Sequence, residues 1–403
     1  MTGAATRPSL APSAESPTDN ELRARARALL PEIRARAGEA EALRRIPDAT
    51  IAAIREAGLF RVLQPSRWGG YERDIQLFLD IAMDIASACG STGWVYSVIG
   101  VHNWHLALFD ARAQAEVWAQ DHDTLTASAY SPLGDVERVE GGFRLNGVWR
   151  ISSGCHHGAW VLLGAVVEEQ NGPQYYTMLV PKVDFEIIDC WHVAGLAATG
   201  SNNLRVENAF VPDYRAHAMP AAGIGGPGAA VNSGGLYRYP FPSVLTNSIT
   251  APMLGMARGA VDAHIELMRG RKRAAYGGEA AAMNGFAQKH VADATAMIDG
   301  AVLQMRANLA EMAASIASGR EIARELRLRL RRDQTRGSLA AIEAANLVFG
   351  HSGGAAILLS SPIQRAWRDV NAARVHAANE VERLAAAYGG ERLGIPASET
   401  SLF

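Results

Sequence analysis

The chain has 403 residues, of which 48% are hydrophobic and 20% are charged, as expected of a folded protein with a large core. Its formal net charge of −2 argues against nucleic acid or an anionic membrane surface as a partner. Its three cysteines are too few for a disulfide framework or a cysteine metal cluster, and no apolar run is long enough to span a membrane, so a cytoplasmic location is expected.

The N-terminal part is predicted to be helical after a short disordered lead-in. Residues 1–20 are rich in Ala, Pro, Ser and Thr and lack the continuous apolar core of a secretory signal. Residues 21–123 then form a predicted helical domain, in which strong helix formers are separated by Pro and Gly stops. The expected helices are Glu21–Ala40, Asp48–Ala57, Ile75–Ser87 and Ser91–Phe109, the last apolar on most sides, as a buried helix is.

The sequence pattern changes from helical to strand-like at residue 124. A β domain is predicted to begin there and to run to residue 220. Short runs of β-branched and aromatic residues alternate with turn residues, and Gly141-Gly142 and Asn171-Gly172 stand where hairpins reverse. The expected strands are Phe143–Leu145, Val148–Ser152, Trp160–Val167, Tyr175–Val180 and Asn203–Val206. This spacing predicts antiparallel strands.

Residues 221–240 are rich in Gly and Ala and are predicted to be a linker or a lid; whether the segment is ordered stays open. Residues 241–403 return to long helical patterns. The expected helices are Leu245–Met268, Asn284–Ala317, Glu321–Leu347 and Pro362–Tyr388, whose Ala-rich faces allow the close approach of a bundle. The predicted fold class is therefore α+β: an N-terminal helical domain, a middle antiparallel β domain and a C-terminal four-helix bundle.

Five short strings occur along the chain in a fixed order. They are Pro65…Trp68-Gly69-Gly70; Asn146-Gly147-x-Trp149-x-x-Ser152-Ser153-Gly154; Thr199-Gly200-Ser201 with Phe210-Val211-Pro212; Arg273-x-x-Tyr276-Gly277; and Gly353-Gly354 followed by Arg365-x-x-Arg368-Asp369. Taken together, from about residue 21 to residue 390, they resemble the acyl-CoA dehydrogenase superfamily. The resemblance implies the acyl-CoA dehydrogenase-like fold.

Departures from that superfamily indicate a subfamily. Acyl-CoA dehydrogenases use a glutamate base, commonly in a short string after the Arg-Asp pair, but here the chain reads Asn-Ala-Ala-Arg-Val-His-Ala-Ala-Asn-Glu over residues 371–380. That string, with Ser153–Trp160, Ser91–Trp94 and Val101-His102, resembles the flavin-dependent aromatic hydroxylases. These include the oxygenase components that act on p-hydroxyphenylacetate and on the phenolic secosteroid of sterol catabolism.

The resemblance implies the oxygenase component of a two-component flavin monooxygenase. Such a protein takes FMNH2 or FADH2 from a separate NAD(P)H-dependent flavin reductase, forms a C4a-hydroperoxyflavin with O2, and hydroxylates an aromatic, phenolic substrate. A homotetramer is the family expectation. No Gly-x-Gly-x-x-Gly string follows an expected strand, so the chain is not expected to bind NAD(P)H itself.

The expected catalytic residues are His376, His102 and Ser153. A histidine suits removal of a phenol proton because its ordinary pKa lies close to neutrality. His376 is expected on a helix with Glu380 one turn later, which would orient the imidazole. The alternative is a routine helix histidine with a routine partner. For His102, at the end of an apolar helix, a hydrogen-bonded core role and a substrate- or peroxide-contacting role both stay open.

The resemblance also implies which residues hold the flavin and the substrate. Ser153 corresponds to the position that hydrogen-bonds flavin N5, and Ser152 is its strand neighbour on the opposite face. The expected flavin-binding residues are Ser153, Ser152, Tyr130, Ser131, Arg273, Ser352, Gly353 and Gly354, the last three from a partner subunit. The expected substrate-contacting residues are His102, Trp94, His157 and Glu380, with Trp104 and His105 as pocket wall. No metal site is expected, because the adjacent His156 and His157 lack further ligands at metal-binding spacing.

Three alternative functions remain at this point. One is an acyl-CoA dehydrogenase-like flavin oxidoreductase, either a dehydrogenase or an oxidase, that keeps its flavin. A second is a monooxygenase that oxidises nitrogen or sulfur instead of a ring carbon. A third is a scaffold subunit without catalysis, against which the joint presence of His102, Ser153 and His376 argues.

Overall fold

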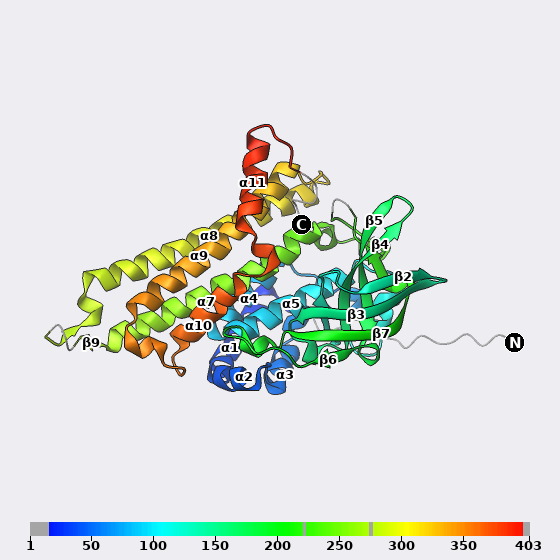
Figure 1. The fold of residues 1–403 in the computed structure, drawn as a ribbon. Helices are drawn as coiled ribbons and strands as arrows, with labels where there is room; N and C mark the ends of the chain where they lie inside the picture. The colour runs from blue at the N-terminus through cyan, green and yellow to red at the C-terminus, as the bar shows by residue number, and fades with distance from the viewer. Residues whose placement is uncertain (1–15, 221–222, 274–276, 398–403) are drawn as a thin grey trace.

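The computed structural model describes residues 16–220, 223–273 and 277–397 and places helices from both ends of the chain beside a β-rich middle (Figure 1). The α+β class is confirmed, as is the expected order of a helical region, a middle region of mostly antiparallel strands and a second helical region. Most of the expected lead-in, residues 1–15, lies outside the described residues. The first helix begins at Asp19, within the last residues of the expected lead-in. Thr18 and Glu21 form a capping box there, in which each side chain binds the other's backbone N–H.

The N-terminal helices are α1 (Asp19–Ala35), α2 (Ala37–Leu43), α3 (Asp48–Glu56), α4 (Ile75–Ala88), α5 (Gly90–Leu106) and α6 (Ala111–Trp118). The expected single helix over residues 21–40 is two helices, which meet at Arg36. Every residue of α5 is buried, as its apolar composition predicts. Helix α5 therefore crosses the interior of the molecule and carries Trp94, His102 and His105 with it.

The middle region consists of two four-stranded sheets. One has the order β1 (Thr126–Ala129), β4 (Trp160–Glu169), β5 (Gly172–Pro181), β8 (Ala216–Ala218), and the other β2 (Asp135–Val139), β3 (Gly142–Ser152), β7 (Asn202–Pro212), β6 (Glu186–Ile188). The strands are antiparallel as predicted, except that β1 pairs with β4 in parallel. Hairpins reverse beside Gly141 and Gly172, both with positive φ. The two strands expected over residues 143–152 form one strand, β3, whose register shifts near Gly147.

The segment from residue 223 to residue 240 is packed against the rest of the protein. This part of the expected linker or lid, residues 221–240, is therefore ordered in the structure. It contains the short turns η7 (Pro227–Ala230) and η8 (Gly235–Arg238). The amide of Phe241 donates to the Gly223 carbonyl at 2.6 Å, so the ends of the segment meet. The buried Asn232 side chain donates to the Ala107 carbonyl at 2.8 Å, which fixes the middle of the segment to the end of α5.

The C-terminal helices are α7 (Phe241–Gly270), α8 (Gly285–Ala317), α9 (Arg324–His351), α10 (Pro362–Ala373) and α11 (Val381–Arg392). Helices α7 to α10 lie side by side, and α11 packs against one end of α9 and projects from the group (Figure 1). The expectation of one helix over residues 362–388 is wrong. The chain leaves the helix after Ala373, and His376 caps the short turn η12 (Ala377–Asn379) before α11 begins.

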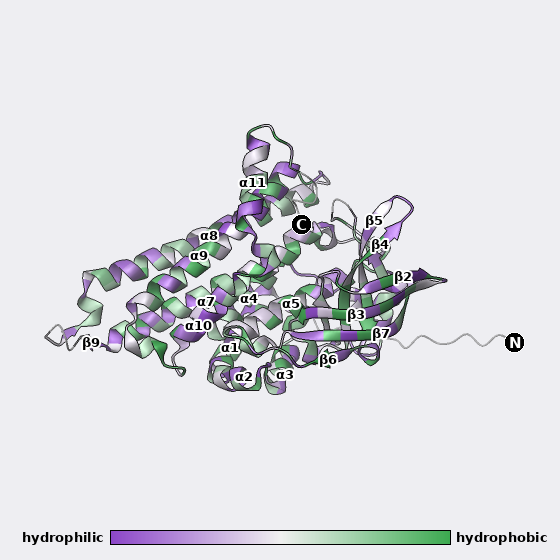
Figure 2. Ribbon diagram, viewed as in Figure 1, coloured by the Kyte–Doolittle hydropathy of each residue, from purple (hydrophilic) through white to green (hydrophobic). Residues whose placement is uncertain are grey.

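Helices from both ends of the chain share one hydrophobic core, in which α4, α5 and α7 make the central contacts. The sheets enclose a second core around Phe143, Trp149 and Met178. Hydrophilic residues gather on the projecting ends of β2 and β5 (Figure 2). Among the described residues, no helix has the length and apolar character needed to cross a membrane.

Candidate active site

Ser153 lies just after β3, where this strand reaches the helices. Its hydroxyl shares a hydrogen bond of 2.7 Å with the Ser201 hydroxyl and accepts one of 3.2 Å from the Trp94 indole N–H. Its neighbour Ser152 is fully buried, and its hydroxyl has no hydrogen-bond partner among the described residues. Strand alternation thus separates the two serines, and Ser153 is the one that is partly exposed.

Trp94 connects Ser153 with His376. Besides donating to Ser153, its ring meets the His376 ring edge-on, with 5.7 Å between ring centroids. The three side chains come from β3, α5 and the turn after α10, which are far apart in sequence. The structure thus brings Ser153 and His376 into one group, with Trp94 between them.

His376 is held by its own turn. The backbone N–H of Ala378 donates to His376 Nδ1 at 3.1 Å, so the neutral ring carries its hydrogen on Nε2. The side chain is exposed, yet desolvation by the surrounding protein, and then the positive charge of Arg331, lower the pKa of His376 to about 4. The expectation that Glu380 orients this ring from the same helix is wrong: Glu380 precedes α11 and pairs with Arg383 at 2.9 Å.

His102 has the opposite arrangement. It is 1% exposed on α5, and its Nδ1 lies 2.6 Å from the Thr126 carbonyl oxygen. A carbonyl only accepts, so the hydrogen is on Nδ1 and Nε2 has a free lone pair. Nε2 has no hydrogen-bond partner among the described residues. Burial lowers the pKa of His102 to about 4, so the ring is neutral at pH 7.

A chain of buried hydrogen bonds runs from Tyr130 to the segment after β8. The Tyr130 hydroxyl lies 2.9 Å from His105 Nδ1, His105 Nε2 lies 3.3 Å from His217 Nδ1, and His217 Nε2 lies 3.3 Å from the Gly225 carbonyl oxygen. The carbonyl fixes the direction, because it accepts from His217, which must then accept from His105, which accepts from Tyr130. The Tyr130 ring also meets the His102 ring edge-on at 5.8 Å.

Other predicted residues lie apart from this group. The His157 side chain is 5% exposed and has its Nδ1 3.6 Å from an Asp48 carboxylate oxygen; its described contacts do not include Trp94 or His376. Ser131 is exposed beyond β1. Trp104 is buried and donates to the Leu236 carbonyl at 2.8 Å, as part of the wall under the 223–240 segment.

Sequence reasoning did not assign site roles to Ser201 and His217. Ser201 was part of a family string, Thr199-Gly200-Ser201, and its place two residues after Thr199 was the available signal. Its hydroxyl lies 2.6 Å from Thr199 Oγ1, which extends the Ser153 hydrogen bonds into the β domain. His217 carries no local signal, since only the fold brings β8 beside α5.

A separate cavity of about 280 Å³ lies where the ends of α7 and α9 meet the start of α8. Its lining includes Met268, Arg271, Asn284, Phe286, His290, His351 and Gly353. Arg271 donates to the Ser352 carbonyl at 2.7 Å, and a Cβ on Gly353 would lie 2.6 Å from its guanidinium. Arg273 is in β9 (Lys272–Arg273), opposite β10 (Glu279–Ala280), and its side chain, like Tyr276, is outside the described part. Gly354 begins a short exposed turn.

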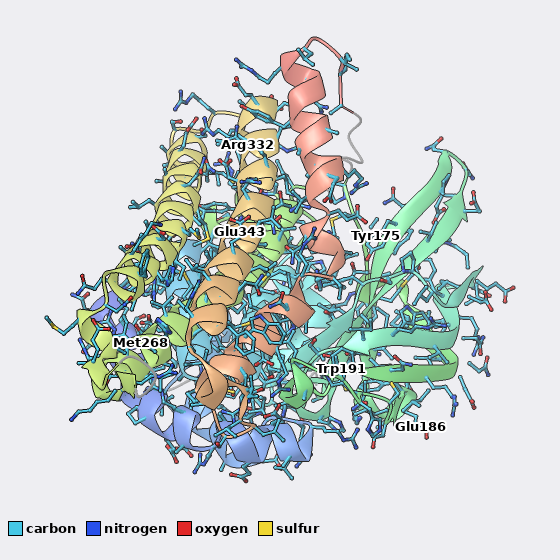
Figure 3. The ribbon with its side chains drawn as sticks, turned by 60° about the vertical axis from the view of Figure 1, so that its left-hand side comes forward. Tyr175, Glu186, Trp191, Met268, Arg332 and Glu343 are labelled. Carbon is cyan, nitrogen blue, oxygen red and sulfur yellow. The ribbon has the colours of Figure 1, made fainter. Side chains whose placement is uncertain are left out.

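The two groups of expected flavin-binding residues lie at different ends of α7. This helix has 30 residues and is therefore about 45 Å long. Phe241, its first residue, has its ring 5.7 Å from that of Tyr130, whereas Met268, near its end, lines the cavity. Tyr175, whose hydroxyl donates to the Tyr130 carbonyl, and Met268 lie on opposite sides of the molecule (Figure 3). Within one chain, no single flavin reaches from Tyr130 to Arg271.

Among the described residues, no three His, Cys, Asp or Glu side chains lie close enough together to hold a metal ion. The site is therefore made of hydroxyl, indole and imidazole groups. His102 and His376 supply its imidazoles, and the pKa of each ring is lowered to about 4.

Comparisons with known proteins agree with this architecture. Residues 16–121 and 247–381 match family models described as the N-terminal and C-terminal domains of acyl-CoA dehydrogenase. The chain is 46% identical over 375 residues to the flavin-dependent monooxygenase oxygenase subunit HsaA of Rhodococcus jostii strain RHA1, which covers 93% of this chain and 98% of the relative. It is 33% identical to the oxygenase component of an FADH2-dependent resorcinol hydroxylase of Rhizobium sp. strain MTP-10005, over 90% of this chain and 91% of the relative. A crystal structure of HsaA from M. tuberculosis matches with a TM-score of 0.90 at 43% identity, covering 94% of this chain and 99% of that one.

Proposed function

The chain belongs to the acyl-CoA dehydrogenase-fold family of flavin-dependent monooxygenase oxygenase subunits, and from this membership we propose what it does. It is the oxygenase component of a two-component monooxygenase that uses reduced flavin and O2 to hydroxylate an aromatic substrate. We propose further that the substrate is a phenol. The observation that carries this proposal is that α5 brings His102, whose Nε2 has no hydrogen-bond partner among the described residues, within about two helical turns of Trp94, which contacts Ser153 and His376.

The side chains around Ser153 fit a reduced flavin. A flavin nitrogen changes between hydrogen-bond donor and acceptor with its redox state, and a serine hydroxyl can serve both. Ser153 meets this need, because Ser201, its hydroxyl partner, can also either donate or accept. Reduced flavin, when bound, would activate O2, so that one of its oxygen atoms goes to the substrate and the other is released as water. The residues of the chain orient it, exclude water and move protons.

The two histidines take different tasks in this proposal. His102 accepts the proton of the substrate hydroxyl at Nε2, which raises electron density on the ring to be oxidised. The Nδ1 of His376 accepts the hydrogen bond of the Ala378 amide, so the ring can donate a hydrogen bond only from Nε2–H. We propose that it donates this bond to the oxygen atom of O2 that is released as water. We therefore assign to His102 the role of base that was expected of His376. Of these two neutral rings, only His102 has a ring nitrogen, Nε2, whose lone pair has no partner among the described residues.

The cavity beside Arg271 is proposed to hold the phosphate end of the flavin of a neighbouring copy. An arginine beside Ser352 and a close-packed Gly353 is a suitable setting for a phosphate. Because this cavity and Tyr130 lie at opposite ends of α7, the flavin of one copy would receive its two ends from two chains. The expected homotetramer meets this requirement.

The partner protein is a flavin reductase, as the two-component naming of the relatives implies. We propose that contact with it is transient and that reduced flavin diffuses between the proteins. The Gly-x-Gly-x-x-Gly string at residues 223–228 leads into the short turn η7 and not into a long helix, so it lacks the strand–turn–helix setting of a dinucleotide-binding site, which supports delivery of reducing power from outside the chain.

The test is a reaction with reduced flavin prepared separately. The protein is mixed anaerobically with FMNH2 or FADH2 and then with O2 and a panel of phenols, indoles and thiophenes. We expect a phenol to gain one hydroxyl group with little H2O2 released, while the protein purifies with little bound oxidised flavin. Formation of H2O2 alone with every phenol would refute the proposal. Reduction of a tightly bound flavin by an acyl-CoA would instead identify a dehydrogenase.

A further inference from the structure

Asp369 lies on α10 at the point where three elements meet. It is 3% exposed, and its Oδ1 accepts the backbone N–H of Leu196 at 2.6 Å. Its Oδ2 is so close to the start of α5 that a Cβ on Gly90 would lie 2.6 Å from it. One carboxylate therefore touches α10, the N-terminal end of α5 and the turn that leads into β7.

The turn at Leu196 depends on this contact. Leu196 has φ 55° and ψ 30°, a left-handed conformation that costs a non-glycine residue about 1–3 kcal/mol. A charge-assisted hydrogen bond from its N–H to Asp369 stabilises this conformation. The preceding Gly195 packs so closely on α10 that a Cβ would lie 2.2 Å from the Arg368 carbonyl oxygen. On its other side, Trp191 donates to the Leu196 carbonyl at 2.9 Å and lies where the sheets meet the helices (Figure 3).

Hydrogen bonds lead directly from Leu196 to Ser153. The Thr199 hydroxyl donates to the Leu196 carbonyl at 2.8 Å, and the Thr199 carbonyl accepts the Gly154 amide at 2.8 Å. Thr199 Oγ1 also lies 2.6 Å from Ser201 Oγ, the partner of Ser153. The position of the Ser153 hydroxyl is therefore set by the turn that Asp369 holds.

The same carboxylate is tied to the other two members of the site. Along α10, the chain runs from Asp369 to Ala373 and then turns to His376. Along α5, Gly90 is one helical turn before Trp94. Trp94 contacts both Ser153 and His376. Asp369 is thus connected to each of these three side chains, although it contacts none of them directly.

We propose that Asp369 is a positioning residue that sets the spacing between Ser153 and His376 by holding Leu196, α10 and the start of α5 together. The inference rests on the proposed function, because it assumes that Ser153 and His376 act on the same flavin. Asp369 touches neither substrate nor flavin. It acts through the backbone of Leu196 and through the two helices.

The charge of Asp369 is set by its neighbours. Burial raises its pKa to about 6, and the charged groups around it are Arg365 and Arg368 on α10 and Glu41 on α2, with the Cys89 thiol at the start of α5. Above pH 6 the carboxylate is charged and accepts the Leu196 N–H most strongly. Since the raised pKa means that ionisation opposes folding, Asp369→Asn is expected to be no less stable than the parent at pH 7.

The experiment compares three variants of the full chain. Asp369→Ala removes the acceptor, and Asp369→Asn retains one. Asp333→Ala is the matched control: Asp333 is 8% exposed on α9, accepts from Asn308 at 2.8 Å, and has no described contact with Leu196 or Ser153. Amide hydrogen exchange is measured without flavin for peptides that contain Gly154 and Thr199. Product formed per O2 consumed is measured with a phenol and with folded protein in excess over reduced flavin, so that little flavin is oxidised free in solution.

Asp369→Ala is expected to exchange the Gly154 and Thr199 amides about tenfold faster, as loss of one buried hydrogen bond allows, and to lower product per O2 about fivefold. Asp369→Asn is expected to restore both. Unchanged exchange in Asp369→Ala overturns the inference, as does an equal effect in Asp333→Ala or no recovery in Asp369→Asn. If exchange responds as expected but the parent protein hydroxylates no aromatic compound, the positioning role stands and the proposed function fails.

Discussion

At the scale of single residues, the two site histidines differ in which ring nitrogen carries the hydrogen. The Thr126 carbonyl fixes the hydrogen of His102 on Nδ1, and the Ala378 amide fixes that of His376 on Nε2. A neutral imidazole has one donor and one acceptor nitrogen. These backbone contacts therefore decide whether the other nitrogen of each ring can donate a hydrogen bond to a ligand or accept one from it. In the proposed function one ring therefore accepts a proton and the other donates a hydrogen bond, although both are histidines with lowered pKa.

His102→Asn tests the acceptor role. The asparagine amide can still donate to the Thr126 carbonyl, but the basic Nε2 is gone. We expect hydroxylation to slow by about 10²–10⁴, the usual contribution of general-base catalysis, with H2O2 formed in its place. Single-turnover product yield measures the effect. A yield within twofold of the parent would show that His102 is only a core residue.

Ser153→Ala removes the hydroxyl that Trp94 and Ser201 share. We expect product per O2 to fall about tenfold, corresponding to about 1.4 kcal/mol for one lost hydrogen bond at the site. Ser152→Ala is the matched control, because Ser152 is buried next to it with an unpartnered hydroxyl. Equal effects of the two substitutions would contradict the assignment of Ser153.

At the residue level, local strings in the sequence carried the signal for the candidate site. Trp94, His102, Ser153 and His376 lie in such strings, and the structure brings Ser153, Trp94 and His376 into one connected group. Their roles stay predictions. Partners supplied by distant segments were out of reach, because nothing near His102 in the sequence indicates that Thr126 faces it.

At the scale of elements, the break between α10 and α11 decides where His376 lies. Residues 362–388 contain no proline or glycine after Pro362 and are rich in helix formers, so local propensity predicts one continuous helix. Tertiary contacts override that propensity through Asn379, which is 1% exposed. Its side chain accepts from Gln334 at 3.0 Å and Ser338 at 2.8 Å and donates to the Ala373 carbonyl at 2.9 Å. The strands were easier to predict, because hairpin glycines mark their ends in the sequence.

Asn379→Asp tests this anchor. The new carboxylate keeps the two acceptor contacts but faces the Ala373 carbonyl without a hydrogen to donate. We expect a loss of about 2 kcal/mol in the free energy of unfolding, the cost of an unmet buried polar group, measured by denaturant unfolding. Asn371→Asp, on the half-buried side of α10, is the control. No difference between the two would mean that Asn379 does not hold the turn.

At the scale of the whole molecule, several buried histidines are neutral, which makes the fold sensitive to acid. Burial lowers the pKa of His102 and of His217 to about 4, against an ordinary value of 6.5. The unfolded chain therefore takes up protons first as pH falls below 6.5, and stability is lost down to about pH 4. Each residue contributes up to about 3 kcal/mol to this loss. Thermal unfolding midpoints should fall between pH 6.5 and 4, less steeply in His217→Asn; equal slopes would contradict this origin.

The length of α7 predicts complementation between two inactive chains. His102→Asn damages one end of the site and Arg271→Ala the other. In the proposed arrangement of copies, a mixed oligomer would bring one copy's intact Tyr130 end to the other copy's intact Arg271 end. We expect co-expressed, doubly tagged mixtures to regain about a quarter of parental activity if the copies associate at random in pairs. Activity no higher than that of the separate variants would contradict shared flavin sites.

The hydrogen bonds from Tyr130 through His105 and His217 to Gly225 all point the same way. Their dipoles therefore add, with the positive end at the Gly225 carbonyl and the negative end at the phenolic oxygen. Because a carbonyl closes the chain and can only accept, a proton cannot leave through it, and the direction of the chain cannot reverse while the hydrogen bond to Gly225 is kept. This wall of the site thus has a permanent polarity that favours a ligand group with a hydrogen to give and disfavours an anion.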